Sequence, residues 1–190
     1  MTRIALLGQP GCGKTSTGKI LAKVLGLKFI DIDDDIYEQR WGCTVAQKLS
    51  QMTDDEFLDL EDETLSAFID EGAGPDVVLA LSGSNPCRPK AMEKLRSKNF
   101  TLIWLDSPES DILQRLERMK VNRIVGQASM GMAQVLPYRR QFYEKYYHLR
   151  AFIGHDWTVE EQAGEAEAVL RASSLFSGCA GKMQSTRNRP

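Results

Sequence analysis

The 190-residue sequence lacks the features of a membrane protein, a secreted disulfide scaffold or a nucleic-acid-binding protein. No apolar run approaches the roughly 20 residues of a membrane span, and the net charge of -2 provides no basic surface for nucleic acid. Only four cysteines are present, and their spacing fits neither a C-x-x-C motif nor a zinc site. An apolar strand pattern begins at Ile4, which leaves no room for a leader peptide. We therefore expect a reduced cytoplasmic protein that binds neither nucleic acid nor a membrane.

Short apolar runs alternate with helical patterns, which predicts an α/β fold with a parallel sheet and helices on both faces. The strands of this five-stranded sheet are expected over residues 4–7, 28–30, 77–81, 100–105 and 151–153. Helices are expected over residues 14–25 and 135–147, with two or three more before residue 72. Pro108 is expected to open another helix under a Ser107 cap, and Thr158 and Glu161 form a capping box for the last one.

The regular patterns break between residues 121 and 133, where Gly126, Gly131 and small polar residues dominate. We expect a mobile lid loop over about residues 119–133, with Arg123 near its entrance. Residues 173–190 are rich in serine, glycine and basic residues, and we expect a disordered tail there. The remaining residues, 1–172, are enough for one α/β domain.

The first predicted strand leads into residues 8–15, GQPGCGKT, which satisfy the P-loop (Walker A) pattern G-x-x-x-x-G-K-[ST]. Such a turn points backbone N–H groups at phosphate oxygens and places the phosphates on a helix N-terminus. Lys14 is expected to reach the β- and γ-phosphates, and the Thr15 hydroxyl to bind Mg²⁺. The sequence therefore predicts ATP with Mg²⁺ as ligand. The nucleotide-binding residues expected here are Gly8, Gly11, Cys12, Gly13, Lys14, Thr15 and Ser16.

Four aspartates follow the second predicted strand: Asp31, Asp33, Asp34 and Asp35. Ligands of open α/β sheets bind beyond the carboxyl ends of the strands, so this run is expected near the γ-phosphate. Asp31 and Asp33 are two residues apart, so on an extended segment both side chains would face the site. A kinase needs one carboxylate near Mg²⁺ and often one near the accepting hydroxyl. We expect Asp34 and Asp35 to begin the next helix, where the helix dipole favours acidic side chains.

Together these motifs resemble the shikimate kinase family over about residues 4–153. The resemblance also involves Arg123 in the lid, a Ser-Gly-Ser turn (Ser82, Gly83 and Ser84) where the family has three glycines, and Arg139 with Tyr143 in an R-x-x-x-Y element. Residues 81–86 and 139–143 resemble still more closely the shikimate-kinase-like N-terminal domain of threonine synthase-like proteins. In those proteins the domain precedes a pyridoxal-phosphate (PLP) domain, which this chain does not contain.

The resemblance implies a three-layer P-loop fold of the nucleoside-monophosphate-kinase type. It also implies a monomer that transfers the γ-phosphoryl group of Mg-ATP to a hydroxyl of a small anionic metabolite. Asp31 would then lie near Mg²⁺, and Asp33 would orient the accepting hydroxyl. The Ser-Gly-Ser turn would bind the substrate, and Arg139 would bind its carboxylate. Arg123 would close over the phosphates and the acceptor, and Arg115 or Arg118 would lie against the adenine.

Three departures from the family pattern affect the acceptor. Leu58 replaces an arginine that would hold the carboxylate of shikimate, while Glu61 is retained. Losing such a charge-assisted contact removes about 1.5–3 kcal/mol of binding. The triple glycine has become Ser-Gly-Ser, and the acidic run carries one extra residue before Glu38. ATP chemistry is therefore expected, with an acceptor that need not be shikimate.

Two other functions stay open from the sequence. One is a non-catalytic ATP-binding domain that regulates a partner or fused PLP domain; Leu58 favours it, whereas intact Lys14, Asp31 and Asp33 oppose it. The other is a kinase for a nucleoside monophosphate or another small acceptor, which the fold alone allows. A nucleotide acceptor would need several arginines for its phosphate, and residues 36–70 contain a single arginine, Arg40.

Overall fold

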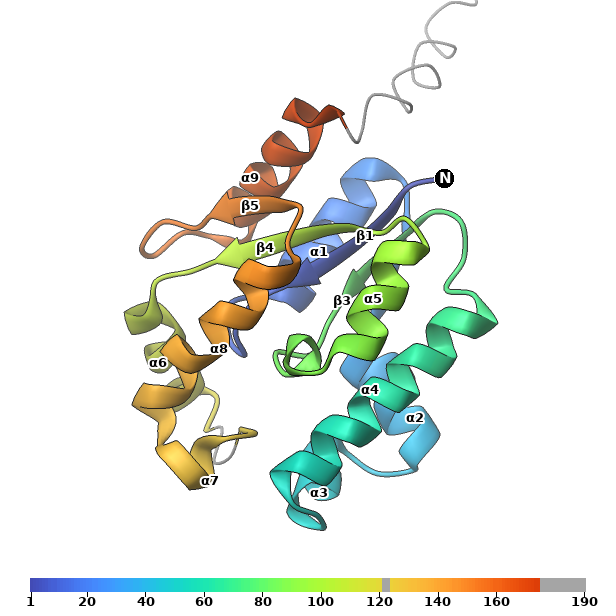
Figure 1. Cartoon of the computed structure of the whole chain (residues 1–190). Coiled ribbons are helices and arrows are strands. Elements are labelled where there is room, and N and C mark those ends of the chain that lie inside the picture. Colours follow the sequence, from blue (N-terminus) through green and yellow to red (C-terminus); the bar gives the residue numbers. More distant parts are fainter. Residues whose placement is uncertain (121–123, 175–190) are drawn as a thin grey trace, which may run out of the picture.

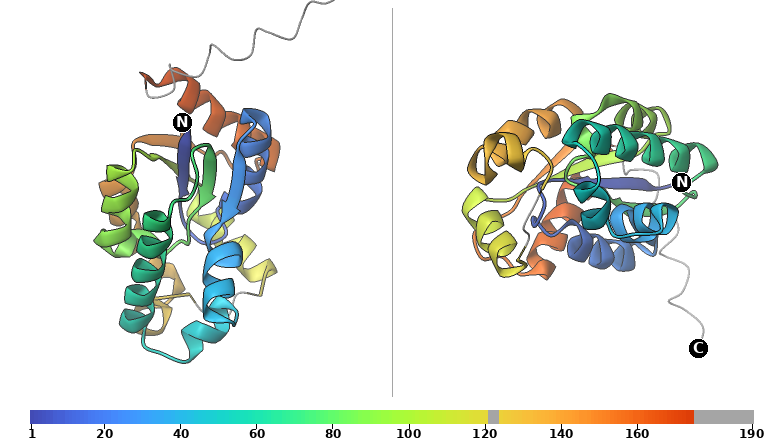
Figure 2. Two further views of the ribbon diagram at one scale, coloured as in Figure 1. Left: turned by 90° about the vertical axis from the view of Figure 1, so that its right-hand side faces the viewer. Right: turned by 90° about the horizontal axis from the view of Figure 1, so that it is seen from below.

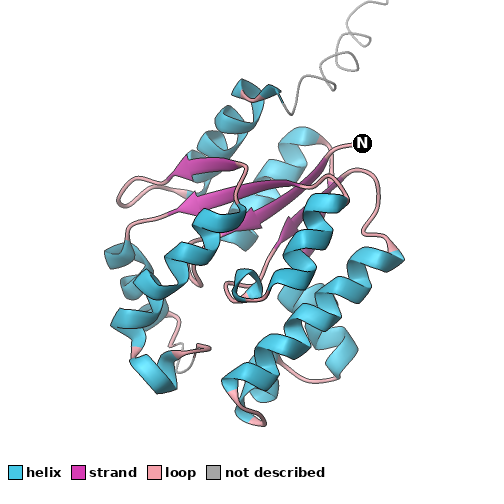
Figure 3. Cartoon of the chain, viewed as in Figure 1, coloured by secondary structure: helices cyan, strands magenta, loops and turns pink. Residues whose placement is uncertain are grey.

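The expected five-stranded parallel sheet is present in the computed structural model, which describes residues 1–120 and 124–174. The strand order is β2-β3-β1-β4-β5, and every pairing is parallel. Figure 3 shows the strands as a central layer between helices. The bounds are β1 (Arg3–Leu7), β2 (Lys28–Asp31), β3 (Val77–Ala80), β4 (Thr101–Asp106) and β5 (Leu149–Phe152).

The helices confirm most of the predicted pattern and add α5, a helix that the sequence reading did not include. They are α1 (Lys14–Leu25), α2 (Glu38–Trp41), α3 (Val45–Ser50), α4 (Asp54–Glu71), α5 (Pro89–Ser97), α6 (Glu109–Arg118), α7 (Gln127–Met130), α8 (Met132–Tyr146) and α9 (Val159–Ala172). Two short helices of other types are also present: a π-helix, η1 (Ile32–Tyr37), and a 3-10 helix, η2 (Asn85–Cys87). None of the helices in the described ranges is long and apolar enough to cross a membrane.

Strand alternation divides the core into two layers, one on each face of the sheet. Ala5 and Leu7 of β1 pack with residues of α4, α5 and α8. Ile4 and Leu6 face the opposite way and pack with residues of α1, α6 and α9. Figure 1 and Figure 2 show α5 and α1 on opposite sides of β1. The protein is therefore the three-layer α/β fold that the sequence predicts.

The strand order places the ligand-binding crevice at the ends of β1 and β3. These strands are neighbours, but α1 follows β1 on one face and α5 follows β3 on the other face. Such a switch point separates the loops beyond the strands and opens a crevice between them. The P-loop follows β1 and the Ser-Gly-Ser turn follows β3, so the fold brings these two motifs to the same crevice.

Local capping signals account for several helix starts. The capping box at Thr158 is confirmed, because its hydroxyl accepts from the Glu161 N–H while the Glu161 side chain accepts from the Thr158 N–H. The expected cap at Ser107 is wrong. Pro108 occupies the N-cap position of α6, one residue later, and the Ser107 hydroxyl has no hydrogen-bond partner within the described segments.

The expectation of an irregular segment throughout residues 121–133 is also wrong for its second half. Gly126 begins α7 with a φ of 86°, and Gly131 both ends α7 and begins α8 with a φ of 76°. The two glycines thus provide helix caps, which pattern reading interpreted as a loop. As a result α8 begins at Met132 rather than at residue 135. Arg123 and residues 175–190, most of the expected tail, lie outside the described residues.

Candidate active site

The P-loop forms the turn between β1 and α1. Gly13 is the N-cap of α1 with φ 97° and ψ 15°, a left-handed conformation in which a Cβ is strained. The Lys14 ammonium lies inside the turn and donates to the carbonyl oxygens of Gly8 and Gln9, both at 2.9 Å. Cys12 is fully buried in the core, and its Sγ lies 4.0 Å from the Lys14 ammonium. A cation thus stands at the centre of an anion-binding turn.

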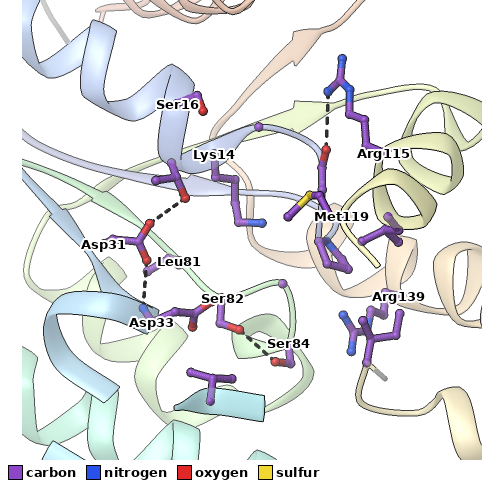
Figure 4. A pocket seen from close by; sticks show the side chains of 18 of the residues that line it. Lys14, Ser16, Asp31, Asp33, Leu81, Ser82, Ser84, Arg115, Met119 and Arg139 are labelled. Atoms are coloured by element: carbon purple, nitrogen blue, oxygen red, sulfur yellow. Dashed lines mark hydrogen bonds between the residues drawn. The ribbon is translucent and has the colours of Figure 1, made fainter. Parts of the chain in front are cut away.

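Thr15 and Asp31 bring the P-loop and β2 together. The Thr15 hydroxyl donates to Oδ2 of Asp31 at 2.6 Å (Figure 4). A hydroxyl and a carboxylate are hard oxygen ligands of the kind that Mg²⁺ prefers when it also binds phosphate and water. No group of three or more acidic, histidine or cysteine side chains suited to a metal occurs in the part of the chain that the structure describes. The pair therefore fits an ion that arrives with its nucleotide, and does not form a complete metal cage.

The acidic run is helical rather than extended, which corrects one premise of the sequence reading. Asp31 is the N-cap of η1, and its Oδ1 accepts from the N–H groups of Asp33 at 3.0 Å and Asp34 at 3.5 Å. Asp34 and Asp35 lie in the first turn of η1, as expected, and Asp35 accepts from the N–H of the Asp31 cap at 2.8 Å. A π-helix holds one more residue per hydrogen-bonded turn than an α-helix. This explains how the run accommodates the extra residue before Glu38.

Asp33 and Asp31 still face the same cavity despite the helical backbone. Asp33 is partly accessible through the cavity, but its Oδ1 is shielded from solvent and has no hydrogen-bond partner among the described residues. Burial, with a smaller contribution from the negative charge of Asp31, raises the pKa of Asp33 to about 7. Asp33 is therefore a strongly desolvated carboxyl group next to the phosphate loop.

The Ser-Gly-Ser turn packs directly against the P-loop. A Cβ on Gly83 would lie 2.8 Å from Cδ and 2.9 Å from the backbone N of Pro10, so only glycine fits without displacement. The Ser82 and Ser84 hydroxyls lie 3.2 Å apart, and Figure 4 shows both near Asp33. The Tyr143 hydroxyl donates to the Gly83 carbonyl at 2.7 Å, which ties α8 to the turn.

Arg139 lies one helical turn before Tyr143 on α8 and enters the same cavity. It is buried, and its Nη2 donates to the Val125 carbonyl oxygen at 2.7 Å. The next residue along, Gly126, donates its N–H to Oδ2 of Asp54 at 2.7 Å. The two residues before α7 are thus connected to both α8 and α4.

Glu61 is the most deeply buried carboxyl group of the site. It projects from α4 with 1% of its surface exposed, and neither oxygen has a hydrogen-bond partner in the described ranges. Burial, and then the nearby charge of Asp33, raise its pKa to about 8. The Ser84 and Ser82 hydroxyls and the guanidinium of Arg139 act in the opposite direction. Glu61 is thus held protonated near neutral pH when the cavity contains no ligand.

Most of these groups line one cavity of about 720 Å³. It brings together most of the residues singled out from the sequence, although Gly8 and Cys12 are not part of its wall. The expected residues on its wall are Gly11, Gly13, Lys14, Thr15, Ser16, Asp31, Asp33, Ser82, Gly83, Ser84, Arg115, Arg118 and Arg139.

Two parts of the wall were missed by sequence reasoning. Trp157, Thr158 and Gln162 line it from the start of α9, far from the P-loop in sequence. An apolar group of Val45, Leu49 and Phe57 lines it from α3 and α4. No local motif marks these residues, because their place in the site comes from packing of distant helices. The Thr158 capping box was visible, but it indicated only a helix start.

The two arginines of α6 differ in their surroundings. Arg115 is half-buried and donates to the Gly11 carbonyl oxygen at 3.5 Å, whereas Arg118 is exposed. Both lie at the cavity wall beside the P-loop. Leu58 lines a second, smaller cavity instead, of about 460 Å³, which Arg139 also borders.

The comparisons with known proteins agree with this geometry. A family model described as shikimate kinase matches residues 10–170. Threonine synthase-like 1 from Homo sapiens is 40% identical over 174 residues, which are 91% of this chain and 22% of that protein. The chain thus spans about a fifth of the length of that relative. Shikimate kinase from Clostridium botulinum is 30% identical over 168 residues, 88% of this chain and 96% of that enzyme.

A solved structure supports the same grouping. Shikimate kinase from Bacteroides thetaiotaomicron superposes with a TM-score of 0.72 at 25% identity, covering 90% of this chain and 98% of that one. The likeness thus extends over most of both chains.

Proposed function

Since the chain belongs to the shikimate kinase family, we propose that it transfers the γ-phosphoryl group of Mg-ATP to a hydroxyl of a small anionic metabolite. The observation that carries this proposal is the convergence of Lys14, the Thr15–Asp31 pair and Asp33 on one side of a cavity, with Arg139 on another. One site would thus contain the groups that bind the phosphates, the metal ion and the acceptor.

The nucleotide end of the site follows from the P-loop. The loop N–H groups and Lys14 would bind the β- and γ-phosphates, and Arg115 or Arg118 would contact the adenine. Lys14 would exchange its bonds to the Gly8 and Gln9 carbonyls for phosphate oxygens. Thr15 and Asp31 would hold Mg²⁺, which supplies charge neutralisation at the transferring phosphoryl group.

The acceptor end follows from Asp33, the Ser-Gly-Ser turn and Arg139. Arg139 would bind a carboxylate, and Asp33 would orient the hydroxyl in line with the γ-phosphorus. The hydroxyl oxygen forms the new bond to phosphorus, the bond to the β–γ bridging oxygen breaks, ADP leaves, and the hydroxyl proton is released to solvent. We propose that Arg123 closes over the phosphates from the lid and excludes water.

A second candidate is a regulatory ATP-binding domain that acts with a threonine-synthase-like PLP domain. Leu58 at the position of the expected arginine favours it, as does the 22% share of the human relative that this chain spans. Such a domain would bind Mg-ATP without passing its phosphoryl group to an acceptor. The two candidates therefore differ in turnover and not in nucleotide binding.

Release of ADP from Mg-ATP, measured with and without shikimate and other small hydroxylated acids, tests the proposal. We expect ADP release that depends on an acceptor and that Asp33→Asn abolishes while Mg-ATP binding is kept. Tight Mg-ATP binding with no acceptor-dependent ADP release would contradict the kinase proposal and favour the regulatory domain.

A further inference from the structure

Glu61 presents two oxygens to the acceptor end of the cavity with no partner for either. The side chain is 1% exposed, and neither Oε1 nor Oε2 has a hydrogen-bond partner of normal geometry among the residues that the structure describes, although the Ser84 and Ser82 hydroxyls lie near enough to lower its pKa. An unpartnered buried carboxyl group destabilises a protein, and such groups are rare for that reason. Because Glu61 lines the cavity, a ligand can supply the missing partner.

α4 does not supply a cation for Glu61, because the residue at position 58 is leucine. Leu58 lies one helical turn before Glu61, and residues three apart on a helix share a face. Its side chain instead packs with Leu49, Phe57 and Val125. A cation at position 58 would lie within reach of Glu61, whereas leucine leaves the carboxyl group without one.

Two carboxyl groups and one guanidinium surround the acceptor end of the cavity. Asp33 and Glu61 contribute two buried carboxyl groups, and Arg139 contributes one guanidinium. Lys14 lies on the phosphate side and contacts the P-loop carbonyls. Arg115 contacts the same loop. A purely anionic acceptor would engage Arg139 and leave the buried Glu61 with no cation beside it.

We propose that the acceptor is a small amino acid with a hydroxylated side chain, whose ammonium group binds Glu61 while its carboxylate binds Arg139 and its hydroxyl faces Asp33. This inference rests on the proposed kinase function and names the substrate class of the same site. An ammonium group carries three donors on one compact centre, enough for both oxygens of Glu61. The neighbouring Ser82 and Ser84 hydroxyls can complete its surroundings.

The electrostatic state of Glu61 agrees with this assignment. Its raised pKa, about 8, comes first from burial and then from the Asp33 charge. A bound ammonium would favour the ionised carboxylate and remove that penalty. A neutral hydroxyl would satisfy one oxygen without favouring the ionised carboxylate as strongly. The amino group of the acceptor therefore supplies the cation that Leu58 of α4 does not provide.

Calorimetric titration with matched compounds tests the inference. The full chain is saturated with Mg²⁺ and a non-hydrolysable ATP analogue, then titrated with L-serine, L-homoserine and L-threonine and with their deaminated counterparts, 3-hydroxypropionate, 4-hydroxybutyrate and 3-hydroxybutyrate. We expect at least one amino acid to bind at least tenfold more tightly than its deaminated counterpart, consistent with a hydrogen-bonded charge pair. Equal or tighter binding of the deaminated acids, or binding of no amino acid in the set, would overturn the inference.

Three variants assign the preference to the residues named. Glu61→Gln is expected to bring the two affinities within about twofold of each other, while Glu63→Gln, an exposed carboxylate on the same helix, keeps the tenfold difference. Leu58→Arg is expected to lose the preference as well, because its guanidinium would occupy the place of the ammonium. An amino acid preference that survives both Glu61→Gln and Leu58→Arg would contradict the role of Glu61.

Release of ADP with the same compounds separates this inference from the kinase proposal. Turnover with the hydroxy acids but not with the amino acids would leave the kinase proposal standing and overturn the amino acid assignment. Amino acid binding without ADP release would support the assignment and contradict the kinase proposal.

Discussion

The Thr15 hydroxyl and the Asp31 carboxylate are joined by a hydrogen bond of 2.6 Å, which connects the first residue after the P-loop lysine to the end of β2. β2 and β1 are not neighbours, because β3 lies between them. The contact therefore crosses the crevice at the carboxyl ends of the strands. It brings together two oxygen ligands that sequence reading placed near Mg²⁺ on separate grounds.

Asp31→Asn should weaken Mg-ATP binding by at least tenfold, because a charged oxygen ligand is replaced by a neutral one. Binding of ATP in the presence of a chelator should change little, since the phosphates still contact the P-loop. Titration calorimetry with and without Mg²⁺ measures both quantities. Asp34→Asn, an exposed neighbour in the same acidic run, is the control and should behave like wild type. Equal losses in the two variants would argue against a metal role for Asp31.

Gly83→Ala should destabilise the protein by about 1–3 kcal/mol, because the added Cβ lies within 3 Å of Pro10 backbone and ring atoms. The change forces the P-loop and the Ser-Gly-Ser turn apart, so Mg-ATP affinity should fall as well. Gly164→Ala is the matched control, since a Cβ there meets nothing within 4 Å and the residue lies within α9. It should raise stability by about 0.5–1 kcal/mol. Denaturant unfolding tests whether Gly83→Ala lowers the free energy of unfolding and Gly164→Ala raises it.

Glu61 should make the ligand-free protein less stable as the pH rises. Its pKa of about 8 in the fold exceeds its ordinary value of 4.5, so the unfolded chain releases this proton first. The stability associated with the protonated group is therefore complete below pH 4.5 and is lost as the pH rises through 8. Asp33, the Ser82 and Ser84 hydroxyls and Arg139 are the groups that face it.

Glu61→Gln should remove this dependence. Relative to the variant, wild type should lose up to about 1.4 kcal/mol per pH unit within that interval. Denaturant unfolding at intervals from about pH 5 to 8.5 measures the difference, with Glu63→Gln expected to follow wild type. Parallel curves for wild type and Glu61→Gln would mean that Glu61 is already ionised in the fold.

Asp106 should matter for stability and not for ligand binding. Arg140 binds it through two bonds of 2.9 and 3.0 Å, and Nε of Arg150 binds it at 3.0 Å. Both guanidinium groups also lie over the Trp104 ring. Asp106→Asn should cost about 2 kcal/mol, as the loss of charged, partly buried hydrogen bonds does. Asp70→Asn removes an exposed carboxylate paired with Lys94 and should cost less than about 1 kcal/mol. Thermal unfolding distinguishes the two, and equal shifts would contradict the assignment.

The elements that could be predicted from the sequence are those with a local cause. The P-loop follows from fixed spacing, α1 from its apolar periodicity, and α9 from the Thr158 capping box. The strands of the sheet follow from short, continuously apolar runs. In each case a few consecutive residues contain the whole signal, so the structure confirms the expectation within a few residues.

The features that could not be predicted depend on context. The acidic run reads as extended, but Asp31 caps η1 and the backbone turns into a π-helix. Gly126 and Gly131 read as loop residues, although each caps a helix. Trp157 and Gln162 reach the cavity only because α9 packs beside α1. The missing partner of Glu61 is likewise visible only once burial and neighbours are known.

The most direct measurement of the central claim is the fate of the γ-phosphoryl group. The protein is incubated with Mg²⁺ and ATP carrying oxygen-18 in that group, together with a pool of shikimate, L-serine, L-homoserine and L-threonine, and the products are analysed by mass spectrometry. The account predicts label in a phosphate ester of one acceptor, absent with Asp33→Asn. Label found only in inorganic phosphate, or retained entirely in ATP, would contradict it.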